Sequence, residues 1–194
     1  MQALALMAML LVLAAGCSAR QVTLTDRSGI EQELLVRSLE RAVAGLDVSR
    51  LTGRRVALEL YALTKDQAFA RQFVAARLER RGVDVTADTS QADLRLKVFA
   101  TVLGVDRGET LLGIPALQVP VVAVPIPEIA LFKWVRHRGA AEIQVYAYEP
   151  RTDRLVGDVP AALGRSKYDQ FTVLLVIGFT VTDLDQRAEP TAAE

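Results

Sequence analysis

The chain has one cysteine, Cys17, one histidine, His137, and no excess charge of either sign. A single cysteine excludes an internal disulfide, so stability must come from packing. Lysine plus arginine and aspartate plus glutamate both number 23, and this lack of a basic excess argues against a general nucleic-acid-binding protein. The scarcity of histidine and cysteine leaves mainly carboxylates as metal ligands, and Asp84, Asp88 and Asp93 are spaced too widely for a calcium loop. We therefore expect no metal and no cofactor.

The chain also lacks an apolar run of the roughly 20 residues that a membrane-crossing helix needs. Its apolar run from Ala3 to Leu13 is shorter, is preceded by no lysine or arginine, and leads through Ala14-Ala15-Gly16 to Cys17. An apolar segment followed by small residues and a cysteine is typical of bacterial lipoprotein signals. This order predicts a signal peptide over residues 1–16 and lipidation of Cys17. Ser18 after the cysteine indicates anchoring on the periplasmic face of the outer membrane.

After the anchor, three further segments are predicted. Residues 17–27 form a lipidated tether, residues 28–182 a single periplasmic domain, and residues 183–194 a disordered acidic tail. At 194 residues in total, the chain leaves enough length after Cys17 for one domain with a substantial core.

Hydrophobic periodicity places helices and strands along the first half of that domain. Ser28-Gly29-Ile30-Glu31 has the form of a capping box and starts an amphipathic helix that ends near Leu46. The spacing then predicts a strand over 56–63, a helix over 66–81 stopped by Gly82, a short strand over 83–85, and a strand over 94–102.

The second half begins with an unusual segment, Leu111 to Phe132, which contains four prolines and a single charge, Glu128. Four prolines are incompatible with a regular helix or a central strand, so extended polyproline-like backbone is expected. Alternation then predicts strands over 142–148 and from 155 onward, and a last strand over 172–181.

These elements predict an α/β (α+β) fold: a mixed, largely antiparallel sheet with two helices packed on one face and a proline-rich extended insertion. The order is similar at the level of fold to periplasmic α/β modules, such as the amino-terminal domain of the TolB protein and the curli secretion lipoprotein. Likeness of fold alone implies no function.

A closer resemblance lies in the middle of the chain. The segments that carry it are Glu109–Pro115, Pro127–Lys133 and Arg136–Gly139, together with Gly157 and Gly164-Arg165-Ser166. With these motifs the chain resembles a family of uncharacterised bacterial lipoproteins, from the first helix to about Gly178. The resemblance implies a lipoprotein, and it implies no catalytic or binding residues.

Catalytic chemistry has weak support in the sequence. His137 with Asp153 or Asp158 and Ser166 could supply a nucleophile triad, but no Gly-x-Ser-x-Gly elbow surrounds Ser166. A surface histidine in a basic turn is the better interpretation. We therefore expect a protein that is not an enzyme.

Two segments are candidates for contact with a partner or with the membrane. The cluster Lys133 to Arg138, which contains Trp134, could bind lipid phosphates or peptidoglycan carboxylates, although a solvated turn with Trp134 over the core is favoured. The proline-rich insertion could instead dock on a partner or the membrane, or be buried against its own sheet. The candidate contact residues are Ile114, Pro115, Val121, Val122, Pro125 and Trp134.

The function that follows is non-catalytic. We expect a lipid-anchored envelope protein with a structural or assembly role, attached to the membrane by its lipid and bound to a protein partner or to further copies of itself. Two alternatives stay open at this point: a subunit of an outer-membrane secretion or trafficking assembly, and a periplasmic small-ligand-binding or catalytic domain.

Overall fold

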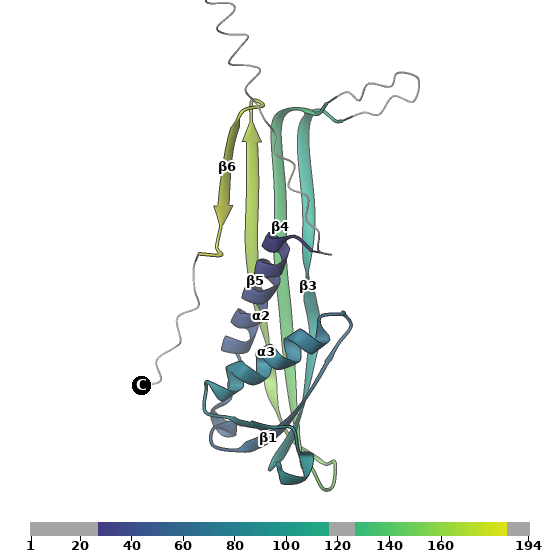
Figure 1. The fold of residues 1–194 in the computed structure, drawn as a ribbon, viewed down its shortest axis with the longest axis vertical. Helices are drawn as coiled ribbons and strands as arrows, with labels where there is room; N and C mark the ends of the chain where they lie inside the picture. Colours follow the sequence, from purple (N-terminus) through teal and green to yellow (C-terminus); the bar gives the residue numbers. More distant parts are fainter. Residues whose placement is uncertain (1–26, 117–126, 186–194) are drawn as a thin grey trace, which may run out of the picture.

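A computed structural model describes residues 27–116 and 127–185 (Figure 1). In chain order the helices and strands are α2 (Gly29–Ala44), β1 (Arg55–Ala62), α3 (Gln67–Glu79), β2 (Asp84–Thr86), β3 (Leu94–Ile114), β4 (Ile129–Tyr148), β5 (Leu155–Val173) and β6 (Ile177–Thr182). Two short 3-10 turns, η1 (Ser49–Leu51) and η2 (Thr89–Gln91), connect them. No helix within these two ranges is long and apolar enough to cross a membrane.

The strands form one six-stranded sheet in the order β2-β1-β3-β4-β5-β6. Strand β1 runs parallel to β2, to which it is connected through α3, and it also runs parallel to β3. Strands β3 to β6 pair antiparallel. Both helices lie on one face of this sheet (Figure 1). The predicted mixed, largely antiparallel α/β fold is therefore confirmed.

Helix α2 begins as the sequence predicts. The Ser28 hydroxyl accepts from the Glu31 backbone nitrogen at 3.3 Å, and the Glu31 carboxylate accepts from the Ser28 backbone nitrogen at 2.9 Å. This capping box satisfies two amides that the first turn would otherwise leave unpaired. The apolar stripe of α2, which includes Leu34, Leu39 and Val43, is fully buried against the sheet.

The strands on either side of the proline-rich segment are much longer than predicted. Strand β3 continues to Ile114 and β4 begins at Ile129, so both ends of the segment pair with each other as strands. Alternation could not mark these extensions, because charged residues and glycines interrupt it beyond Val102. Pro120, Pro125, Val121 and Val122 lie outside the described residues.

The predicted last strand is two strands. Strand β5 ends at Val173, the chain turns at Leu174, Leu175 and Val176, and β6 returns from Ile177 to Thr182. The sequence hides this turn because its residues are apolar, whereas hairpin turns are usually marked by glycine, asparagine or aspartate.

The end of the domain also lies further along the chain than predicted. Leu184, which we assigned to the tail, is buried, and the Asp183 carboxylate accepts from Arg41 on α2 at 2.7 Å. The predicted tail therefore begins with residues that are held on the body of the domain.

Strands β3, β4 and β5 project beyond the amino-terminal end of α2 (Figure 1). We call this projection, with the adjoining part of β6, the arm; it consists of residues 107–114, 129–137 and 168–182. We call the remainder, which the helices cover, the body. Beyond the first turn of α2 no helix of the described ranges lies on the arm (Figure 1), although Val135 and His137 on its helix side are buried.

Candidate functional site

The face of the sheet opposite the helices, here called the open face, is covered by none of the described elements. Solvated sheet faces are usually polar. This one carries aromatic residues in two groups: a body cluster of Tyr61, Phe99 and Tyr146, and an arm cluster of Phe132, Trp134, Phe171 and Phe179. Exposed aromatic groups of this kind mark surfaces that bind other molecules.

The body cluster spans three adjacent strands. The ring of Phe99 stacks on Tyr61 with 5.3 Å between centroids and meets the edge of Tyr146 at 5.9 Å. Tyr61 remains 44% exposed and Phe99 36% exposed. The packed rings thus form an apolar patch that remains partly exposed to solvent.

Charged side chains at the margin of the body cluster are held in place. The Tyr61 hydroxyl donates to Glu59 at 2.8 Å, and this hydrogen bond raises the pKa of Tyr61. The Lys97 ammonium lies 4.2 Å from the Tyr148 ring centroid, a cation–π contact. An aromatic centre with a fixed polar margin is the usual composition of a protein-binding surface.

The arm cluster is a row of rings across three strands. Trp134 stacks on Phe171 at 5.8 Å, and Phe171 stacks on Phe179 at 4.9 Å. The Arg136 guanidinium lies 5.0 Å above the Trp134 ring. The exposed end of this row is Phe179 on β6, which is 50% exposed.

A buried carboxylate supports the arm cluster. Asp169 accepts from the Trp134 indole nitrogen at 2.9 Å and from Arg138 at 3.0 Å. Burial acts to raise the pKa of Asp169, but the hydrogen bonds from Arg138 and Trp134 outweigh it, so the pKa lies below its ordinary value. Asp169 is therefore charged at neutral pH, and its contacts hold Trp134 in position.

We had expected a turn from Lys133 to Arg138, but this segment is part of strand β4. Strand alternation divides its side chains between the two faces. Trp134 lies on the open face with Arg136 and Arg138, whereas Lys133 and His137 lie on the opposite face. The aromatic–cation cluster therefore exists, and it contains only half of the residues in the run.

His137 is not a surface histidine: it is 8% exposed. No described group is hydrogen-bonded to its Nδ1. Ser166, the other member of the candidate triad, is buried and donates its hydroxyl to the Leu34 carbonyl of α2 at 2.8 Å. That hydroxyl holds α2 on the sheet. Because it is buried and already donates its hydrogen bond, Ser166 is not positioned to act as a nucleophile.

The burial of His137 makes stability depend on pH. Burial lowers the pKa of His137, and the nearby Arg107 guanidinium lowers it further, while Glu31, a backbone hydrogen bond with Tyr168 and Asp169 act in the opposite direction without outweighing them. Below the ordinary histidine pKa of about 6.5 the unfolded chain binds a proton that the folded chain resists. We expect the free energy of unfolding to fall as the pH drops from 7 towards 5.5. Urea titrations should show this fall in the wild type and a flatter profile in His137→Gln; equal slopes would contradict the assignment.

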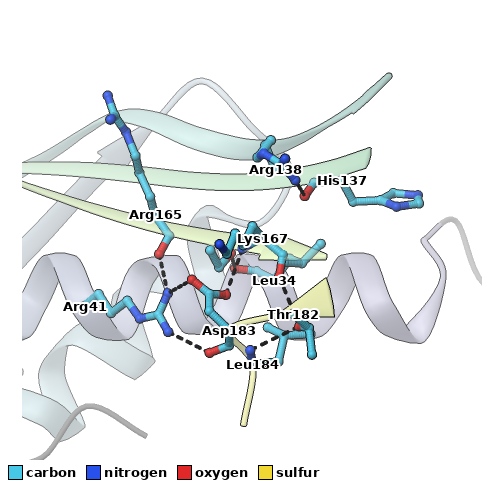
Figure 2. A network of polar contacts seen from close by, with 10 residues as sticks. Leu34, Arg41, His137, Arg138, Arg165, Lys167, Thr182, Asp183 and Leu184 are labelled. Carbon is cyan, nitrogen blue, oxygen red and sulfur yellow. Dashed lines mark hydrogen bonds and ion pairs between the residues drawn. The ribbon is translucent and has the colours of Figure 1, made fainter. Parts of the chain in front are cut away.

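A polar network that the sequence did not reveal holds the end of β6 (Figure 2). Arg41 donates to the Arg165 carbonyl at 2.5 Å, to the Asp183 carboxylate at 2.7 Å and to the Asp183 carbonyl at 2.9 Å. The Lys167 backbone nitrogen donates to the same carboxylate at 2.8 Å. Through this network, α2 fixes the edge strand that carries Phe179.

A polar hollow of about 490 Å³ lies at the far end of the body. It is lined by Thr89–Asp93 and Glu149–Arg151. Asp93 in this hollow accepts from the Arg55 backbone nitrogen at 2.9 Å, so it serves to hold the loop. Within the described parts of the chain, no three potential metal ligands come together.

The other predicted contact residues lie near the end of the arm or outside the described residues. Ile114 is the last residue of β3, is 48% exposed, and is followed by Pro115. Val121, Val122, Pro125 and Cys17 are not described. The body cluster was missed, although one signal was available: Tyr61 and Phe99 occupy the alternate positions of strands whose other positions are aliphatic.

Comparison with known proteins gives little further information. No family model matches the chain, and no curated protein matches it. Among solved structures it is similar to a neuraminyllactose-binding hemagglutinin homolog from Helicobacter pylori, with 12% identity and a TM-score of 0.28. That match covers 67% of this chain and 63% of the other.

Proposed function

We propose that the protein is a lipid-anchored component of the bacterial envelope that performs no catalysis and binds another protein through the open face of its sheet. The observation that carries this proposal is the exposed body cluster. Tyr61 and Phe99 are large aromatic side chains that stack on each other, and side chains already ordered by such packing lose less entropy on binding. Tyrosine and other aromatic residues supply much of the binding energy in protein interfaces.

The form of the open face favours a macromolecular partner over a small ligand. Small-molecule sites are concave and enclose most of their ligand. The body cluster lies instead on the surface of three adjacent strands, and its neighbouring charges, such as Glu59 and Lys97, contact aromatic residues of the same face. An extended sheet face of this kind suits the large contact area of a second protein better than the enclosed site of a small ligand.

The anchor in this proposal is Cys17, and replacing it should have a large effect on localisation. We expect Cys17→Ser to keep residues 1–16 and to carry no lipid, because both steps of processing depend on the thiol. Mass spectrometry of the amino-terminal peptide and separation of inner and outer membranes measure this outcome. Ser18→Ala is the matched control and should still be lipidated. A free Cys17 thiol in the wild-type protein would contradict the proposed anchor.

A further inference from the structure

The turn between β5 and β6, at the far end of the arm, combines exposure with backbone strain. Leu174 and Leu175 have φ angles of 49° and 70°, a region that side chains other than glycine and asparagine rarely adopt. They are 60% and 54% exposed, and Val176 is 77% exposed. Both leucine side chains are more than half exposed, so burial within the described fold does not account for apolar residues at these strained positions.

The turn is nevertheless firmly held. The Leu174 backbone nitrogen donates to the Leu131 carbonyl at 2.8 Å, and the Leu175 nitrogen donates to the Ala130 carbonyl at 3.0 Å. These bonds fix the turn against the start of β4, so its three apolar side chains project in a defined direction.

Further exposed aliphatic side chains surround the turn. They belong to the adjoining ends of β3, β4 and β6: Leu112, Ile114, Ile129, Leu131 and Ile177. We call these five residues, with Leu174, Leu175 and Val176, the apolar tip. The ammonium of Lys133 lies beside the tip and bridges Glu128 at 2.8 Å and Glu109 at 3.1 Å, so charge is partly neutralised there.

Behind the apolar tip, the order of side chains along the arm matches a membrane interface. The aromatic row with Trp134 follows first, and Arg136, whose guanidinium lies over the Trp134 ring, follows one alternate position further towards the body. Aromatic rings favour the headgroup level of a bilayer, and arginine is attracted to anionic lipid phosphates. This sequence of aliphatic, aromatic and cationic groups is complementary to a lipid surface.

The place where the described chain begins fits the same orientation. Leu34 lies over Gly139 and Ser166, whereas Ala42, further along α2, lies over Gly164, so the start of α2 points towards the arm. From Gly29 to the level of Leu131, near the start of β4 where the turn is held, the remaining distance is roughly 20 Å, from the rise per residue of helix and strand. The ten residues from Cys17 to Asp26 can span at most about 35 Å. A lipid on Cys17 and the apolar tip can therefore enter the same membrane.

We propose that the apolar tip inserts into the lipid bilayer on which the protein is anchored, so that the body stands away from the membrane with its open face accessible. This inference rests on the proposed lipid anchor. Insertion removes the aliphatic side chains of the tip from water, which is the main favourable contribution to such binding.

The test uses the full lipidated protein in vesicles of phosphatidylethanolamine and phosphatidylglycerol. Leu175→Cys carries an environment-sensitive fluorophore, and Leu63→Cys, at a position 99% exposed after β1, is the matched control. We expect the emission of the Leu175 probe to shift to shorter wavelength and to be quenched by brominated acyl chains, and the Leu63 probe to show neither change. Replacing phosphatidylglycerol by a neutral lipid should reduce the quenching.

Other outcomes would overturn the inference. An unshifted Leu175 probe on a protein that floats with the vesicles would show an anchored protein with its tip in water. A shift without bromolipid quenching would mean that another protein or a second copy covers the tip. Labelling of Cys17 together with loss of flotation would show instead that the anchor itself is absent.

Discussion

Gly164→Ala should destabilise the protein by about 3 kcal/mol or more, the upper end of what overpacking costs. A Cβ at this position would fall inside contact distance of the Ser38 carbonyl oxygen and the Ala42 backbone nitrogen. Both atoms belong to the backbone of α2, which cannot rotate away as a flexible side chain could. The helix would have to move off β5.

Such a movement would propagate to other contacts of α2. A Cβ on Gly139 would likewise meet the Leu34 carbonyl, so two glycines together let the helix lie close to the sheet. The Ser166–Leu34 hydrogen bond and the ion pair of Arg41 with Asp183 depend on that close approach. We therefore expect the end of β6 to loosen as well.

Gly104→Ala is the matched control, because nothing lies within 4 Å of a Cβ at that position in β3. It should change the free energy of unfolding by less than about 1 kcal/mol. Urea denaturation, followed by the fluorescence of the single tryptophan Trp134, measures both variants. Equal stability of the two variants would contradict the close seating of α2.

Phe99→Asp should reduce binding of the envelope partner by about 30-fold or more, which corresponds to the loss of about 2 kcal/mol at an interface hot spot. The substitution removes the ring at the centre of the body cluster and introduces a charge that burial in the interface would penalise. Folding should survive, since Phe99 is a surface residue of the open face. The measurement is the amount of partner that co-purifies with the tagged, lipidated protein from solubilised envelopes.

Phe69→Asp is the control for this effect. Phe69 is 49% exposed, lies on α3 over the other face of the sheet, and stacks on Phe73 at 5.8 Å. The Phe69→Asp variant therefore loses a comparable contact between two rings, and it leaves the open face unchanged. Equal loss of partner in both variants would assign the effect to stability and not to the binding surface.

The sequence predicted those elements whose signals are local. The capping box at Ser28 and Glu31 and the apolar stripe of α2 are set by neighbouring residues, and both are confirmed. The fold class followed from the same periodicity.

The length of the strands could not be predicted because it depends on pairing between distant residues. Leu111–Ile114 and Ile129–Phe132 are strands because they face each other across the segment of four prolines. Proline is disfavoured within a central strand, but it does not exclude a hairpin whose strands lie on either side of the prolines.

The candidate surface was predicted only in part for a related reason. Trp134 was selected, but its assignment to a basic turn was wrong, because strand alternation separates it from Lys133 and His137. The partners of the body cluster come from β1, β3 and β4, which meet only in the folded sheet. The Leu174–Leu175 turn was missed because its residues contradict the usual preference for glycine and asparagine.

Photocrosslinking in intact cells tests the central proposal most directly. A benzoylphenylalanine placed at Tyr61, on the open face, is compared with one placed at Phe69, on the helix-covered side, in the otherwise unchanged full chain. We expect one discrete protein adduct from position 61 and none from position 69. Absence of an adduct at position 61 in correctly anchored protein, or the same adducts from both positions, would contradict the open face as a protein-binding surface.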